Sequence, residues 1–342
     1  MKFYATFIPG LRDCIAEAVR ERLADAALHK LLDGAVLFET QCTYDTLNFF
    51  CFNNIFAVLD VIEQRPAQGV HALETHLKSI MKKALPPEAE SIMAHNSKNI
   101  RSFRIVTSVE NKPAAVNEAV KAAVEQRIAR ISGLAVNRSR PDAEFWFLYR
   151  AEGFSVFMKR LTLRPSWEKS LHPGELPPPL AWTLCRLGQL RHGDIVLDPF
   201  CGYGSIPCAA LKYFHIKQCI ACDHDKKAAA YTAARFKNRT DGSFILHKTA
   251  FHSLAALVPA QSVDAIITDP PWGHYAAKNA SLYDAMFSLF DSLLKKNGRL
   301  VILGARDDAI GKAAAKRFVM RSNIPILLSG KKAEIFVFEK NA

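Results

Sequence analysis

The chain of 342 residues contains no run of roughly 18 consecutive apolar residues, the shortest length that predicts a membrane-spanning helix. The N-terminus, Met1-Lys2-Phe3-Tyr4-Ala5-Thr6, also lacks the long apolar segment of a secretory signal. We therefore expect a cytoplasmic protein without membrane association. Hydrophobic residues make up 49% of the sequence and charged residues 23%, which is an ordinary balance for a globular protein of roughly two domains.

Regularly spaced cysteines are absent as well. The eight cysteines follow no repeating pattern, which is typical of a reduced intracellular protein. Cys219 and Cys222 form one Cys-x-x-Cys pair, but there is no second pair and no matching histidine cluster. We interpret both as buried thiols of a core strand, with a metal or redox role as the less favoured alternative, and we predict no metal site.

Acidic residues are fewer than basic ones, with 33 Asp and Glu against 45 Lys and Arg, for a net charge of +12. Residues 1–165 hold 22 basic and 18 acidic residues, and residues 166–342 hold 23 and 15. The excess is therefore spread over both halves. A basic surface of this kind favours a polyanionic partner, and nucleic acid is the commonest one.

The N-terminal half shows no cluster of catalytic residue types. Its patterns of apolar residues predict a mixed α+β layer. Strands are expected at residues 3–7, 35–39, 57–64, 102–109, 144–149 and 154–160, and helices at 11–32, 71–84 and 117–131.

Residues 164–180 follow as a proline-rich linker that contains His172-Pro173-Gly174-Glu175-Leu176-Pro177-Pro178-Pro179. A hinge without ligand contacts is the less favoured alternative for this linker.

The C-terminal half alternates strands and helices, which predicts a mostly parallel α/β sheet. A buried strand, Ile195–Leu197, leads into Asp198-Pro199-Phe200-Cys201-Gly202-Tyr203-Gly204 and then a helix. Such glycines let the backbone approach a ligand at a helix N-terminus. Pro207 stands where a dinucleotide fingerprint has its third glycine, which argues against NAD. Asp198 at the strand end suits a cationic amino group instead.

A second strand ends at Cys222-Asp223-His224-Asp225, roughly twenty residues after the glycines. A carboxylate at this distance is placed to bind ribose hydroxyl groups, and we favour Asp223 for that role. Asp225 instead suits the N-cap of the following helix, 226–236.

The strand Val263–Thr268 stops at Asp269-Pro270-Pro271-Trp272-Gly273, because two prolines cannot continue a central strand. Asp269 and the carbonyl of Pro270 can each accept one N–H of a planar amine, and Trp272 can stack on a nucleobase. This arrangement would hold a weakly nucleophilic exocyclic amine against an electrophilic methyl group. The alternative is a plain proline-rich turn.

Taken together, the Asp198-Pro199-x-Cys201-Gly202-x-Gly204 and Asp269-Pro270-Pro271-Trp272 motifs resemble the class I S-adenosylmethionine-dependent amino-methyltransferases. The segment 172–181, the opening at Pro9-Gly10-Leu11 and the pattern from Phe103-Arg104-Ile105 to Arg140-Pro141-Asp142 resemble THUMP-domain-containing RNA guanine-N2 methyltransferases that act on tRNA.

The resemblance implies a ferredoxin-like domain at residues 1–60, a THUMP RNA-binding domain at 61–163, the linker at 164–180 and a Rossmann-like class I methyltransferase domain at 181–342. It implies S-adenosyl-L-methionine as cofactor and RNA, above all tRNA, as partner, for a monomer or a complex with a small activating subunit. The implied cofactor-binding residues are Asp198, Pro199, Cys201, Gly202, Gly204, Asp223, His224, Ala250 and Asp269. The implied catalytic residues are Asp269, Pro270, Pro271 and Trp272.

The sequence departs from the family pattern at three places. Ala209 stands where many relatives carry Glu, Pro207 replaces an aliphatic residue, and Lys248-Thr249-Ala250-Phe251 lacks an Asp near the expected adenine position. Three alternatives stay open. Two of them keep the chemistry, namely the same transfer on ribosomal RNA and a DNA adenine or cytosine amino-methyltransferase, since Asp-Pro-Pro-Trp serves those enzymes too. The departures motivate the third, a non-catalytic RNA-binding protein with a decayed cofactor site.

Overall fold

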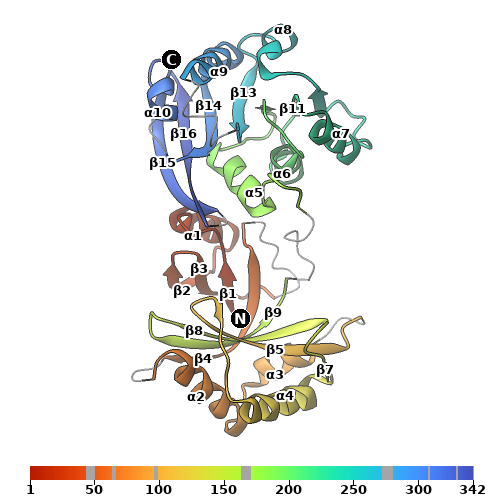
Figure 1. Cartoon of the computed structure of the whole chain (residues 1–342), viewed down its shortest axis with the longest axis vertical. Helices are drawn as coiled ribbons and strands as arrows, with labels where there is room; N and C mark the ends of the chain where they lie inside the picture. Colours follow the sequence, from red (N-terminus) through yellow and green to blue (C-terminus); the bar gives the residue numbers. More distant parts are fainter. Residues whose placement is uncertain are drawn as a thin grey trace. The chain divides into compact units, whose positions relative to one another are not determined.

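The structure is a computed structural model that describes residues 1–43, 51–63, 67–95, 99–162, 171–271, 280–306, 309–328 and 330–341 (Figure 1). The chain divides into two compact units. Unit 1 comprises Met1–Thr6, Ala16–Asn48 and Phe52–Ser166, and unit 2 comprises Phe7–Ile15, Phe49–Cys51 and Trp167–Ala342. No helix within the described residues is long and apolar enough to cross a membrane.

The described strands of the N-terminal half form one nine-stranded sheet in the order β2-β3-β1-β4-β9-β8-β5-β6, with β7 paired to β5. The strands are β1 (Lys2–Thr6), β2 (Ala27–Leu32), β3 (Ala35–Glu39), β4 (Asn54–Glu63), β5 (Ser102–Val109), β6 (Lys112–Pro113), β7 (Ala135–Val136), β8 (Ala143–Arg150) and β9 (Phe154–Arg160). The helices are α1 (Arg12–Arg22), α2 (Gly69–Lys82), α3 (Pro87–Ala94) and α4 (Glu118–Ser132). The predicted domain boundary between residues 60 and 61 falls inside β4.

Alternation along the strands decides which face of this sheet the helices cover. Phe103 on β5 and Phe145 and Phe147 on β8 are buried in one core cluster with residues of α2, α3 and α4. Figure 1 shows these three helices on one side of β4, β5, β8 and β9. Because side chains alternate between faces, Glu144 and Trp146 point to the opposite side.

The predicted helix at residues 11–32 is wrong beyond its first half. The helix α1 ends at Arg22, and Ala27–Leu32 forms strand β2, which pairs antiparallel with β3. Leu32 lies opposite Ala35, so Asp33 and Gly34 form a two-residue hairpin turn, and Gly34 has φ +93°. The Asp-Gly pair is a strong hairpin signal, and the pairing with β3 overrides the helical spacing of the apolar residues.

The described strands of unit 2 form a seven-stranded sheet in the order β12-β11-β10-β13-β14-β16-β15. The strands are β10 (Ile195–Asp198), β11 (Gln218–Cys222), β12 (Phe244–His247), β13 (Val263–Thr268), β14 (Leu294–Ala305), β15 (Phe318–Leu328) and β16 (Lys331–Lys340). The helices are α5 (Pro178–Leu187), α6 (Ser205–Tyr213), α7 (Lys226–Arg235), η2 (Phe251–Ser253), α8 (Leu254–Leu257), α9 (Ala280–Leu293) and α10 (Ala309–Ala314).

The strands from β12 to β14 are parallel, and β16 runs antiparallel to both of its neighbours. Ile266 belongs to the large core cluster that includes residues of α9 and α10, whereas Gly188 at the end of α5 lies against Ile267. Neighbouring residues of a strand face opposite sides, so helices cover both faces of this sheet. The predicted class, a Rossmann-like sheet preceded by an α+β layer, is confirmed.

Candidate active site

Three carboxylates follow the ends of neighbouring parallel strands in unit 2. Strand β10 ends at Asp198 and lies between β11 and β13. Asp223 follows β11, and Asp269 follows β13. The carboxyl ends of parallel strands meet at one edge of the sheet, which is where open α/β sheets bind ligands. The structure therefore brings together the carboxylates that the sequence singled out.

Asp198 is the most buried of these carboxylates, with 1% of its surface exposed. Its Oδ1 accepts hydrogen bonds from Thr268 Oγ1 at 2.9 Å and from the Phe200 backbone N–H at 3.3 Å. Its Oδ2 is buried and has no hydrogen-bond partner among the described residues. Burial raises the pKa of Asp198 to about 8, and the negative charges of Asp223 and Asp269 add to this effect. A cationic amino group would supply both the missing partner and the missing charge.

The glycine turn after β10 is held by backbone and side-chain contacts. Gly204 is the N-cap of α6 with φ +79°, and its N–H donates to the Cys201 carbonyl at 2.8 Å. A Cβ at Gly204 would lie 3.0 Å from Thr232 Cγ2, so helix α7 leaves no room for a side chain there. Thr232 Oγ1 also donates to the Gly202 carbonyl at 2.8 Å. The turn is therefore clamped against α7 and can present its backbone to a ligand.

Asp223 and Asp225 have separate roles in the structure. The Asp223 carboxylate accepts the N–H of Gly202 at 2.7 Å and the N–H of Asp225 at 2.8 Å, which links β11 to the glycine turn. Asp225 Oδ1 accepts the N–H of Ala228 at 2.8 Å, so the predicted N-cap of α7 is confirmed. His224 lies between them with an exposed side chain. Asp223 keeps further lone pairs for a ligand, and its contact with ribose stays a prediction.

The remaining predicted cofactor residues lie in the segments that follow the carboxyl ends of β10 and β12. Pro199 and Cys201 are buried in the turn after β10, and Ala250 is half-buried between β12 and η2. Burial raises the pKa of the Cys201 thiol, so this sulfur is not a nucleophile at neutral pH. The Cys222 thiol donates to the Thr249 carbonyl at 3.1 Å, which supports its interpretation as a buried thiol. No group of three or more possible metal ligands occurs among the residues the structure describes.

The Asp-Pro-Pro segment begins directly after β13. Asp269 is half-buried, Pro270 is buried and Pro271 is exposed. Trp272 and Gly273 lie outside the described residues. Asp198 ends β10 and Asp269 follows the adjacent strand β13, so a ligand between them would contact both.

The end of the linker packs on the glycine turn, which sequence reasoning did not anticipate. The His172 ring stacks on Tyr203 with centroids 4.3 Å apart, and the Tyr231 ring meets it edge-on at 4.5 Å. Glu175 accepts the N–H of His172 at 3.1 Å and Nη1 of Arg235 at 3.1 Å. The described part of the linker is thus fixed to α7 rather than a free hinge. Tyr231 and Arg235 are four residues apart and therefore lie on the same face of α7. This spacing was the sequence signal for a contact surface on that helix.

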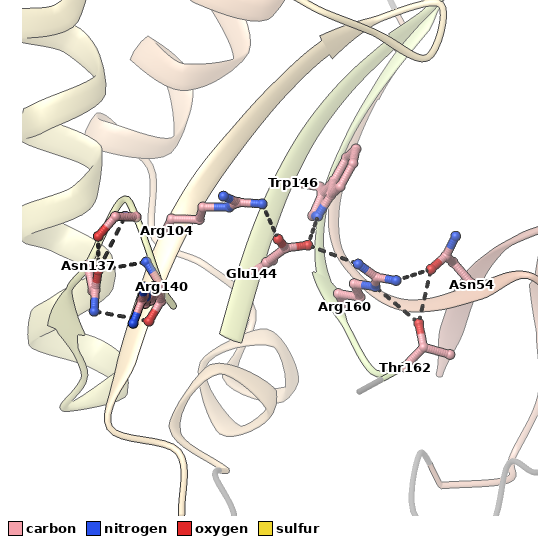
Figure 2. A network of polar contacts seen from close by, with 9 residues as sticks. Asn54, Arg104, Asn137, Arg140, Glu144, Trp146, Arg160 and Thr162 are labelled. Atoms are coloured by element: carbon pink, nitrogen blue, oxygen red, sulfur yellow. Dashed lines mark hydrogen bonds and ion pairs between the residues drawn. The ribbon is translucent and has the colours of Figure 1, made fainter. Parts of the chain in front are cut away.

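Unit 1 carries a polar network across four strands (Figure 2). Glu144, only 4% exposed, accepts Nη2 of Arg104 at 2.6 Å, Nη1 of Arg160 at 3.2 Å and Nε1 of Trp146 at 3.1 Å. Arg160 continues the network to Asn54 on β4. The buried Glu144 carboxylate lies between two guanidinium groups and thereby links β5, β8, β9 and β4 through side-chain contacts.

A cleft of about 390 Å³ lies beside this network at the edge of β5. Arg104, Lys121 and Arg138 line it. Arg138 is paired with Glu125 at 2.7 Å, but the Lys121 side chain has no ion-pair partner among the described residues. Figure 2 shows Asn137 holding the turn that carries Arg140, whose backbone N–H it accepts at 3.0 Å. Lys121 therefore offers positive charge at this cleft without an ion-pair partner among the described residues.

Comparison with known proteins places this geometry among methyltransferases. Residues 165–325 match the family model of the RMKL-like methyltransferase domain. A tRNA (guanine(6)-N2)-methyltransferase of Thermus thermophilus is 28% identical over 247 residues, which cover 70% of this chain and 72% of the relative. The crystal structure of TrmN from Thermus thermophilus superposes with a TM-score of 0.80 at 23% identity, and the match covers 99% of each chain.

Two further relatives show higher identity over a shorter range. A tRNA (guanine(10)-N2)-dimethyltransferase of Methanocaldococcus jannaschii is 32% identical over 149 residues. This alignment spans 40% of each chain, so the present chain corresponds to less than half of that relative's length. The "probable tRNA (guanine(10)-N2)-dimethyltransferase" of Methanothermococcus thermolithotrophicus is 30% identical over 132 residues, which cover 37% of this chain and 80% of the relative.

Proposed function

This chain belongs to the family of RMKL-like methyltransferases, and we propose that it transfers a methyl group from S-adenosylmethionine to the exocyclic N2 of a guanosine in tRNA. The relatives described above are named for this modification. The observation that carries the proposal is the buried, unpartnered Oδ2 of Asp198 one strand away from Asp269-Pro270. Asp198, proposed to bind the cationic amino group of the cofactor, and Asp269, proposed to bind the exocyclic amine of guanine, are then neighbours at one sheet edge.

The residues around the glycine turn fit the cofactor. Asp198 Oδ2 would accept a hydrogen bond from its amino group, and the turn at Gly202 and Gly204 would receive its methionine end. Asp223 would contact the ribose, and His224 and Ala250 would border the adenine side. When bound, the cofactor supplies an electrophilic methyl group on a positively charged sulfur.

Asp269 and Pro270 would orient the guanine. The Asp269 carboxylate accepts one N–H of the exocyclic amine, and the Pro270 carbonyl accepts the other. The amine nitrogen would form a bond to the methyl carbon as the carbon–sulfur bond of the cofactor breaks, and Asp269 would take the proton that leaves nitrogen. Pro271 and Trp272 would hold the plane of the base. This positioning converts a poor nucleophile into one held at attack distance.

We assign unit 1 the binding of the RNA backbone. Arg104, Lys121 and Arg138 supply positive charge at an exposed cleft, and the whole chain has a net charge of +12. In this proposal residues 1–60 form the ferredoxin-like part and 61–163 the THUMP part of one sheet that continues through β4. Residues 164–180 form the linker and 181–342 the methyltransferase domain. We further place the protein in the cytoplasm, as a monomer or with a small activating subunit.

The departures from the family pattern favour a second candidate, a non-catalytic RNA-binding protein. Of these departures, Pro207 gives the non-catalytic candidate no support. Pro207 is the third residue of α6, where the backbone N–H has no intrahelical partner, so a proline fits there. Ala209 is buried against the turn and offers no carboxylate for the cofactor. Cofactor affinity separates the two candidates.

A binding and transfer experiment tests the proposal. Calorimetry with S-adenosylhomocysteine measures occupation of the cofactor site, and labelled S-adenosylmethionine measures transfer to unmodified tRNA, ribosomal RNA and DNA. We expect binding and preferential labelling of tRNA. Binding with label only on ribosomal RNA or DNA would contradict the substrate, and no binding would favour the non-catalytic candidate.

A further inference from the structure

A second cleft, of about 480 Å³, lies in unit 2 between α10 and the strands β15 and β16. It is separate from the glycine turn and from the Asp-Pro-Pro segment. Its lining combines two cations, two apolar side chains and two hydrogen-bonding groups, namely Arg306, Lys312, Met320, Phe336, Asn323 and Glu334. Its volume falls within the range of small-molecule sites.

The polar groups of this cleft are built into the sheet. Glu334 is only 8% exposed, and its Oε1 accepts Nδ2 of Asn323 at 2.8 Å across the β15–β16 pair. This bond uses one of the two N–H donors of the Asn323 amide and leaves oxygen acceptors on both side chains. Acceptors outnumber donors at this end of the cleft, which favours a ligand group that donates hydrogen bonds.

The apolar wall and the cation complete the cleft. Phe336 is buried beneath it, and Met320 is 42% exposed on β15 beside it. Arg306 follows the end of β14, is exposed, and has no hydrogen-bond or ion-pair partner among the described residues. A thioether and an aromatic ring suit a flat ring system, and a free guanidinium suits a phosphate.

The cleft is near the proposed reaction centre. Ile302 on β14 lies beside Thr268 on β13, so Arg306 and Asp269 both follow the carboxyl ends of adjacent parallel strands. From the rise and spacing of β-strands, their Cα atoms are about 11 Å apart. A nucleotide that neighbours the target guanosine in the RNA could therefore reach the cleft.

We propose that this cleft binds one nucleotide of the RNA substrate next to the methylated one. Arg306 holds its phosphate, Met320 and Phe336 contact its base, and Glu334 with Asn323 accepts hydrogen bonds from the amino or ring N–H groups of that base. The role of the cleft is to position the target guanosine and to select its neighbour. The inference rests on the proposed function, because it assumes an RNA substrate.

The test measures binding of an unmodified tRNA transcript in the presence of S-adenosylhomocysteine over a range of salt concentrations. Arg306→Ala should weaken binding about tenfold and lower the slope of log affinity against log salt by about one, as expected for one lost phosphate contact. Glu334→Gln should weaken binding several-fold without a change of slope. Arg321→Ala is the matched control, because Arg321 is an exposed arginine of β15 that pairs with Glu339 outside the cleft.

Transfer kinetics give a second readout. For Arg306→Ala and Glu334→Gln we expect a raised KM for tRNA, with the affinity for S-adenosylhomocysteine and the melting temperature unchanged. An Arg306→Ala slope equal to that of the Arg321→Ala control would overturn the phosphate contact, and unchanged binding by Glu334→Gln would overturn the base contact. Failure of the unaltered protein to bind RNA at all would instead contradict the proposed function.

Discussion

The hydroxyl of Thr268 donates a hydrogen bond of 2.9 Å to Oδ1 of Asp198 inside the sheet of unit 2. These residues are the last of β13 and β10, so one buried bond joins the strand that carries the glycine turn to the strand that carries Asp-Pro-Pro. It also orients the Asp198 carboxylate so that Oδ2 is left for a ligand. The relative position of the two proposed half-sites therefore depends on this contact.

Binding of S-adenosylhomocysteine at pH 7 should release close to one proton. The pKa of Asp198 is raised to about 8 in the free protein, so this carboxyl is mostly protonated at pH 7. An ammonium group at Oδ2 lowers that pKa and expels the proton, and affinity should therefore rise as the pH increases from 6 to 8. Calorimetry in buffers of different ionisation enthalpy measures the proton. Asp198→Asn should bind at least tenfold more weakly and release none; an unchanged release would contradict the assignment.

Removal of the Asp269 carboxylate should separate chemistry from cofactor binding. Asp269→Ala is expected to lower kcat by a factor of at least about 10², because the amine loses both its orienting acceptor and its base. Affinity for S-adenosylhomocysteine should stay within about twofold of the unaltered protein. Single-turnover transfer measures the rate of methylation, and calorimetry measures the affinity for S-adenosylhomocysteine. Equal losses in both would mean that Asp269 serves the cofactor and not the base.

A side chain at Gly204 should destabilise the protein more than backbone strain alone explains. Gly204→Ala combines φ +79° with a Cβ at 3.0 Å from Thr232 Cγ2, and should cost about 2 kcal/mol or more in the free energy of unfolding. Gly242→Ala is the matched control, because its φ is +74° and nothing lies within 4 Å of the added Cβ. It should cost about 1 kcal/mol. Denaturant unfolding compares them, and equal costs would show that α7 yields to the added methyl group.

Loss of the buried carboxylate in unit 1 should be costly. Glu144→Gln leaves Arg104 and Arg160 without their shared counter-charge and should destabilise the protein by about 3 kcal/mol. Glu118→Gln is the control, because its pair with Arg138 has side chains 70% and 50% exposed and should contribute under about 1 kcal/mol. Thermal unfolding distinguishes the two variants. A Glu144→Gln variant as stable as the control would mean that the network does not hold the strands together.

Most of the candidate site could be predicted from local sequence signals. The turn at Gly202 and Gly204 and the break at Pro270 are set by residues that allow only a few backbone conformations, so their places at strand ends could be predicted. The cap by Asp225 depends on a neighbour three residues away and was predictable for the same reason. Strand β2 was not predicted, because its apolar residues also fit a helix and only its pairing with β3 decides between the two.

Contacts between distant residues were the part that the sequence could not supply. Thr268 and Asp198 are 70 residues apart, and their bond exists because β10 and β13 are neighbours in the sheet. The His172–Tyr203 stack similarly joins the linker to the glycine turn. Nothing in the sequence distinguishes Glu144 from other strand residues. Its role follows from strand pairing, which places Arg104 of β5 and Arg160 of β9 against its carboxylate. Periodicity predicts elements, and pairing between elements creates these partners.

The product nucleoside tests the central claim most directly. Unmodified tRNA is incubated with the protein and S-adenosylmethionine, digested to nucleosides and examined by mass spectrometry, with the Asp269→Ala variant in parallel. We predict N2-methylguanosine from the unaltered protein and none from the variant. A different methylated nucleoside, or methylation by both proteins alike, would contradict the proposal that Asp269-Pro270 directs the methyl group to the exocyclic amine of guanine.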